Sequence, residues 1–217
     1  MSGANQPNII TGLLAIHAVI TRGLEVAVES SERFAQQGFP DDASSEGLLN
    51  YLHCLISVLG GHHDTEDTVA FPAFRAKIDA PFDLLAEQHR QLHQVLEEAK
   101  LELAKMSGVP SPNLILLLHK IRELWHPHIA IEEEHFTLDR FATLLPVDEH
   151  QQMGQLCMRH MQQTTGPDYL IVPFLLYNLT PEKRSVFAKD MPPIVTTELV
   201  PVVWKDKWAP MRPFLLT

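Results

Sequence analysis

A histidine and a glutamate continue the apolar stripe of a long helical segment at residues 46–70. Leu52, Leu55 and Leu59 recur at helical spacing, which predicts that they share the inner face of one helix. After three and then four further residues, the same face reaches His62 and Glu66. An ionised carboxylate buried without a partner costs several kcal/mol, and a metal ion removes that cost. The pair therefore points to a buried metal site.

The same arrangement recurs on the neighbouring helical segments. Residues four apart in sequence lie on one face of a helix, with Cβ atoms about 5–6 Å apart, so both can reach one site. His17 falls on the apolar stripe of residues 9–37, and two further pairs fall on the stripes of the third and fourth segments. The predicted metal ligands are His17, His62, Glu66, His89, His93, His128 and Glu132.

The helical segments predict an all-α fold, an up-down-up-down four-helix bundle spanning residues 9–145. Its helices are expected at 9–37, 46–70 and 81–106 and from Ser111-Pro112 onward, where a capping serine precedes a first-turn proline. After Pro146 the pattern changes to a C-terminal helical extension at 147–217, packed on the bundle. Short helices are expected there at 148–161, from 181 and at 196–203, followed by an irregular tail at 204–217.

Glycines and prolines interrupt two of the predicted helices. Pro72 is expected to end or kink the second helix, and Pro127 to kink the fourth, because proline donates no amide hydrogen. Gly60 and Gly61 each lower the helix propensity by roughly 1 kcal/mol relative to alanine. They predict either close contact with another helix or room for a small ligand beside His62.

The donor set favours two ions over one. If both carboxylates and a solvent oxygen bridge two ions, five imidazoles divide three and two between them. One ion is then six-coordinate, and the other keeps an open position for a small molecule. Imidazole and carboxylate at near-octahedral sites suit iron or manganese better than structural zinc.

These residues resemble the hemerythrin-like family, also called the HHE cation-binding domain. The matching parts are His17, His62-His63-x-x-Glu66 with Phe71-Pro72 behind it, His89-x-x-x-His93 and His128-x-x-x-Glu132-Glu133. The resemblance implies a four-helix bundle with an oxo- or hydroxo-bridged non-haem diiron centre that reacts with dioxygen. It implies two iron ions in preference to manganese.

Three further residues remain open as ligands or as neighbours of the ligands. Oxygen-carrying hemerythrins place the last carboxylate five residues after the histidine, so Glu133 is an alternative to Glu132 as the bridge. His63 is extra to the set of those proteins, and as a ligand it would fill the open position. His135, seven residues after His128, is placed just beyond the site, where it would support the ligands or relay a proton.

Composition excludes some partners. The net charge of −10 and the pI near 5.6 leave no basic face for nucleic acid. No uninterrupted apolar run approaches ~20 residues, so no membrane span is expected. Cys54 and Cys157 are far apart and lack motif neighbours, which predicts buried free thiols. With no signal peptide visible, these thiols indicate a cytoplasmic protein.

Three functions follow as hypotheses. The first is a diiron protein that binds or senses dioxygen or a related small molecule. The second is a diiron oxidoreductase or oxygenase acting on an organic substrate or peroxide, with an electron donor as a further partner. Its pocket would be shaped by the extension, which an oxygen carrier does not need. The third is iron storage or buffering. Whether the protein is an enzyme, its substrate and its oligomeric state are not specified by the sequence.

Overall fold

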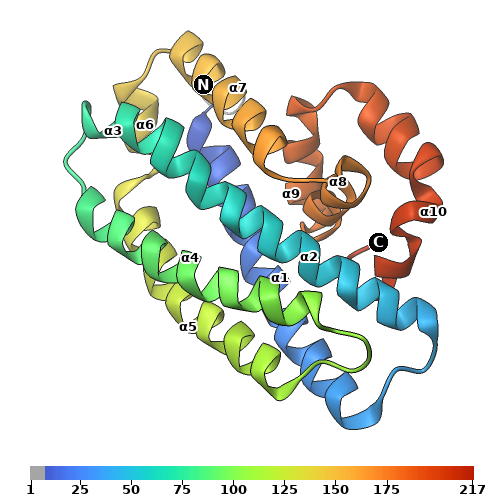
Figure 1. Ribbon diagram of the computed structural model, residues 1–217. Helices are drawn as coiled ribbons and strands as arrows, with labels where there is room; N and C mark the ends of the chain where they lie inside the picture. The colour runs from blue at the N-terminus through green and yellow to red at the C-terminus, as the bar shows by residue number, and fades with distance from the viewer. Residues whose placement is uncertain (1–7) are drawn as a thin grey trace.

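Four long helices form a closed bundle in the computed structural model, which describes residues 8–217 (Figure 1). They are α1 (Ile9–Gln37), α2 (Asp42–Thr65), α4 (Phe82–Ala104) and α5 (Pro112–His135). Each helix packs against two others, because contacts join α1 to α2, α2 to α4, α4 to α5 and α5 back to α1. No strand occurs within residues 8–217, and the predicted all-α bundle is confirmed.

Side-chain caps define where three of these helices, α1, α2 and α5, begin. The Oδ1 atom of Asn8 accepts the amide hydrogen of Ile10 at 3.0 Å, and Asp41 Oδ1 accepts that of Ser44 at 2.7 Å. Ser111 Oγ accepts the amide of Leu114 at 3.1 Å, and Pro112 follows it in the first turn. Gly38, at φ 75°, ends α1 in a conformation that favours glycine. Asp41 thus starts α2 four residues earlier than expected.

The second helix does not stop at Pro72. A π-helical turn, η1 (Glu66–Ala70), follows α2 directly and leads into α3 (Phe71–Arg75), where Pro72 occupies the first turn and needs no amide donor. Where Pro72 was expected to end or kink the helix, the chain instead continues from α2 through the π-helical turn η1 into α3. Pro127 likewise lies inside α5, which runs on to His135.

The remaining chain covers one side of the bundle. It comprises α6 (Leu138–Leu144), α7 (Val147–Thr164), α8 (Asp168–Tyr177), α9 (Pro181–Phe187), η2 (Ala188–Asp190), η3 (Val195–Val203), α10 (Lys205–Trp208) and η4 (Ala209–Phe214). Three of these, α7, α8 and η4, contact α2, and α7 also contacts α1 (Figure 1). The tail expected to be irregular is wound into short helical turns that bury Trp208, Met211 and Phe214. Helices α6 and α8 were not anticipated.

A buried polar network fastens this extension to α1 and α2. The hydroxyl of Tyr51 donates to Asn178 Oδ1 at 2.6 Å, and Arg22 donates to the same oxygen. Arg22 also donates to the carbonyl oxygen of Phe214 at 3.0 Å. Gly47 lies so close to Pro210 that an added Cβ would fall 2.0 Å from its carbonyl oxygen. The glycine at position 47 therefore allows the extension to pack closely on the outer side of α2.

Helix α1 is also long and apolar enough, by length and composition, to cross a membrane. Helices in the core of a bundle pass the same test. In this structure α1 packs between α2 and α5 and buries His17.

Candidate metal centre

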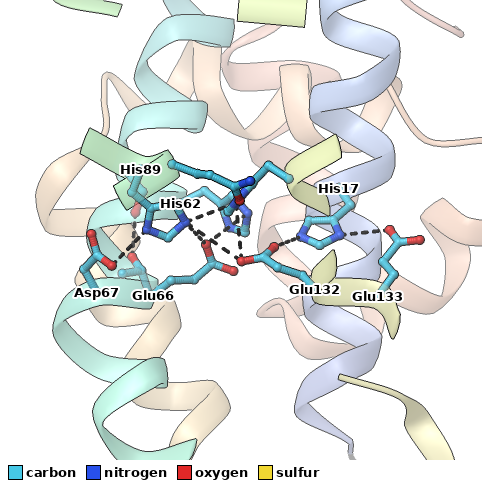
Figure 2. A network of polar contacts seen from close by, with 11 residues as sticks. His17, His62, Glu66, Asp67, His89, Glu132 and Glu133 are labelled. Atoms are coloured by element: carbon cyan, nitrogen blue, oxygen red, sulfur yellow. Dashed lines mark hydrogen bonds and ion pairs between the residues drawn. The ribbon is translucent and has the colours of Figure 1, made fainter. Parts of the chain in front are cut away.

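Six of the seven predicted ligands come together inside the bundle (Figure 2). Helix α1 supplies His17, the end of α2 and the first residue of η1 supply His62 and Glu66, α4 supplies His89, and α5 supplies His128 and Glu132. Each of these side chains belongs to a residue at most 5% exposed. The cluster therefore lies in an interior where its polar atoms have no access to bulk water.

Four of the buried imidazoles lie close to one of the two buried carboxylates. His17 Nε2 lies 3.1 Å from Glu132 Oε2, and His128 Nε2 lies 3.4 Å from Glu132 Oε1. Glu66 Oε2 lies 3.4 Å from His62 Nε2 and 3.5 Å from His89 Nε2. The two glutamates thus occupy the middle of the cluster, where a carboxylate can bridge two cations.

Two sets of four side chains each present ligand atoms within 4.8 Å of one another. One set is His17, His62, Glu66 and Glu132, and the other is His63, Glu66, His89 and His128. Glu66 belongs to both. Each set could hold a metal ion, and the shared carboxylate would join the two positions.

His63 takes the place that the sequence assigned to His93. The prediction that His93 faces the interior is wrong, since it is exposed on α4, and the buried face runs from His89 to Leu92 and Leu96. His63 is 2% exposed and stacks on His89 with ring centroids 4.2 Å apart. The count of five imidazoles and two carboxylates is unchanged, but one of the imidazoles is a different residue.

Outer partners fix which ring nitrogen faces the cluster. The Nδ1 atom of His89 lies 2.8 Å from Asp67 Oδ1, that of His17 lies 2.9 Å from Glu133 Oε1, and that of His128 lies 3.0 Å from Gln88 Oε1. These oxygens accept hydrogen bonds, so each Nδ1 carries the proton and donates it. In the neutral ring, Nε2 then presents a lone pair to the interior, as a metal ligand requires.

The cluster contains many buried polar atoms without a hydrogen-bond partner. Buried polar groups in folded proteins are nearly always paired, so a concentration of unpaired acceptors needs an explanation. The unpaired atoms are His17 Nε2, His62 Nε2, both ring nitrogens of His63 and both carboxylate oxygens of Glu66 and of Glu132. Cations at this position would satisfy them together. The residues present therefore fit a metal centre.

Comparison with known proteins agrees with this geometry. The family model described as the hemerythrin HHE cation binding domain matches residues 8–137. The chain belongs to the hemerythrin HHE family. Neither the curated proteins nor the solved structures gave a match.

Within this hemerythrin HHE domain, Glu132 and Glu133 have separate positions. Glu132 is fully buried between His17 and His128, whereas the side chain of Glu133 is 43% exposed and bonds to the outer nitrogen of His17. The preferred assignment of Glu132 to the cluster agrees with this placement. His135 lies in neither ligand set and is partly exposed near the end of α5.

Burial favours uncharged imidazoles at three positions of the metal-free hemerythrin HHE site. Burial, together with neighbouring imidazoles, holds the pKa values of His62 and His63 well below their usual range. Burial also lowers the pKa of His128 to about 4. Burial and the nearby Glu132 carboxylate raise the pKa of Glu66. For His17, burial acts to lower the pKa, but the contacts with the Glu132 and Glu133 carboxylates outweigh it, and the pKa is raised.

Aromatic and small residues enclose the centre of the domain. The indole of Trp125 is fully buried, with its ring centroid 5.5 Å from that of His17 and 5.8 Å from that of His62. Gly61 faces the end of α7, where an added Cβ would lie 2.6 Å from Thr165 Cγ2, whereas Gly60 faces open space. Of the two explanations for this glycine pair, close helix contact holds for Gly61.

Proposed function

We propose that the chain holds two iron ions in this cluster and that the loaded site binds dioxygen or a related small molecule. The observation that carries the proposal is the convergence of unpaired acceptors from Glu66 and Glu132 with the lone pairs of the surrounding imidazoles. The first set of ligands would hold one ion with two imidazoles, and the second set would hold the other ion with three.

The donor chemistry supports iron. Imidazole nitrogens and carboxylate oxygens are suitable ligands for iron at sites with five or six neighbours, whereas structural zinc favours a closed tetrahedral set. Bound iron would supply reversible electron transfer to a small ligand, which the side chains alone cannot perform. Membership of the hemerythrin HHE family supports a cation at this position.

The protein residues contribute orientation and exclusion of water. Asp67, Glu133 and Gln88 hold the outer protons of three imidazoles, so the inner nitrogens stay directed at the cluster. The neutral imidazoles add no charge, so the total negative charge comes from the carboxylates. Such a set favours the ferrous state and reversible binding over irreversible oxidation.

A second candidate is a diiron oxidoreductase acting on an organic substrate. The observation that favours it is a surface groove of about 340 Å³ between α3 and α7, lined by Phe74 and Met153. Because α7 belongs to the extension, the groove exists only when the extension is folded on the bundle.

Metal analysis and rapid mixing test the proposal and separate the two candidates. The metal-free protein is loaded anaerobically with ferrous iron, and we expect two irons per chain. Mixing with dioxygen in a stopped-flow instrument should give an absorption change that reverses under vacuum. Iron below one atom per chain would refute the proposal. An irreversible change that an organic substrate accelerates would favour the oxidoreductase.

A further inference from the structure

The groove between α3 and α7 combines an apolar wall with one pair of charged groups. Its wall is formed by Phe74 of α3 and by Met153 and Leu156 of α7. Lys77 and Glu149 also line it, with the Lys77 ammonium 2.7 Å from Glu149 Oε2. Both charged side chains are more than a third exposed. At its opening to solvent, the groove therefore has a hydrogen-bond donor, Lys77, next to an acceptor, Glu149, and apolar side chains form the wall below them.

This combination selects for a particular ligand chemistry. A hydroxyl group on an aromatic ring can donate to the Glu149 carboxylate and accept from the Lys77 ammonium at the same time. The ring itself can pack against Leu156 and the thioether of Met153, while Phe74, which is 3% exposed, lies at the floor of the groove. A volume of about 340 Å³ is at the lower end of the range for small-molecule sites, enough for a fused two-ring compound. The pair carries no net charge, so a strongly anionic ligand is not favoured.

A continuous series of aromatic rings leads from this groove to a residue of the metal cluster. The ring of Phe74 is 5.6 Å from that of Phe136, and Phe136 is 5.8 Å from Phe71. Phe71 then stacks on His89 with centroids 5.4 Å apart and an angle of 15° between the planes. All three phenylalanines are at most 4% exposed. The path between the groove and the cluster is therefore packed and dry, which favours electron transfer over exchange of solvent.

We propose that this groove is the docking site of a hydroquinone-type electron donor that reduces the metal centre. This inference rests on the proposed diiron function. A hydroquinone loses both hydroxyl hydrogens and becomes a quinone, releasing two electrons and two protons. Each of two ferric ions takes one electron and becomes ferrous, while the protons pass to Glu149 and to solvent. One molecule of donor thus matches the two-electron capacity of the cluster.

Binding to the metal-free protein tests the groove independently of iron. The probe is 1,4-naphthohydroquinone, titrated anaerobically in a calorimeter into the full chain and into two variants. Leu156→Trp fills the groove at a residue that is 45% exposed, so it should not disturb folding. Leu101→Trp makes the same change on α4, at a residue 63% exposed and outside the groove. We expect at least a tenfold loss of affinity for Leu156→Trp only, and equal affinities in all three proteins would overturn the proposal.

Reduction kinetics test the electron-transfer role. The oxidised, iron-loaded protein is mixed anaerobically with 1,4-naphthohydroquinone, and the loss of its absorption is followed. We expect Leu156→Trp to slow this reaction at least tenfold. Lys77→Met should slow it about threefold. Reduction by dithionite, which does not need the groove, should be unchanged. Equal rates with naphthohydroquinone would refute the role. A chain that binds no iron but still binds the naphthohydroquinone would contradict the diiron function and leave the groove as a binding site.

Discussion

The Nε2 atoms of His89 and His128 lie 3.1 Å apart in the centre of the bundle. Each ring donates its Nδ1 proton outward, to Asp67 and to Gln88 respectively, so two lone pairs face each other across this gap. Such a contact is repulsive unless a cation or a shared proton lies between the nitrogens. The outer hydrogen bonds of the cluster thus determine which ring nitrogens are available to a cation.

Because His63 belongs to the ligand set and His93 does not, alanine at these two positions should have different effects on the amount of bound iron. His63→Ala should lose about one of the two irons, because it removes one of three imidazoles from the second set. His93→Ala should retain both, because His93 is exposed on α4. Iron per chain after anaerobic loading is the measurement. Loss of iron from His93→Ala, with His63→Ala unaffected, would restore the assignment made from sequence.

The outer carboxylates predict an effect on metal affinity without loss of a ligand. Asp67→Ala removes the acceptor that orients His89, and such partners typically contribute 10–100-fold in metal affinity. We expect a loss of that size in a competition titration against a chelator. Asp67→Asn, which keeps an acceptor oxygen, should recover part of it. The exposed Asp64, which bonds to no ring of the cluster, is the matched control as Asp64→Ala. Equal losses in Asp64→Ala and Asp67→Ala would show a general electrostatic effect.

Most of the fold could be predicted because its signals are local. The apolar stripes, the Ser111 cap and the stop at Gly38 act within one or two helical turns. The course of η1 could not be predicted, because a π-helical turn is stabilised by its packing. In the rest of the chain, α6, α8 and the helical turns of the tail were hidden, because such short elements have little stability alone and form by packing against α1, α2 or one another.

The error over His93 has a specific physical origin. Spacing by four residues places His89 and His93 on one side of α4, but they differ by about 40° around the axis, and Leu92 and Leu96 occupy the centre of the buried face. The signal for His63 was present in α2, whose residues 51–59 are apolar nearly all round. A helix of that kind is buried on all sides. His62 and His63 can then both face inward, one toward α1 and the other toward α4.

Gly60 and Gly61 are adjacent, but substitution by alanine should have opposite effects on the free energy of unfolding at the two positions. Gly61→Ala places a methyl group 2.6 Å from Thr165 Cγ2 and 3.3 Å from Met161 Sδ, so α7 must shift, at a cost of roughly 1–3 kcal/mol. Gly60→Ala meets nothing within 4 Å and should stabilise the helix by up to about 1 kcal/mol. Urea unfolding of both variants provides the free energies. The same sign at both positions would mean that α7 does not pack on α2 as described.

The buried imidazoles predict that the metal-free protein loses stability on acidification from pH 6.5 to pH 5. The pKa values of His62, His63 and His128 are lowered from 6.5 in the folded chain, that of His128 to about 4. The unfolded chain therefore binds more protons in this window, and the free energy of unfolding falls as pH falls. The raised pKa values of Glu66 and His17 act in the opposite direction, but they are two groups against three.

Urea unfolding midpoints of metal-free protein at the two pH values provide the measurement, with His63→Gln and His93→Gln for comparison. Removing His63 removes one of the three groups that take up protons on unfolding, so the pH dependence should become shallower. The exposed His93 lies outside the buried set and serves as the control position. A midpoint that rises on acidification would mean that the carboxyl groups dominate the buried charge. A pH dependence that changes only in His93→Gln would mean that the imidazole at position 63 is not buried in the metal-free chain.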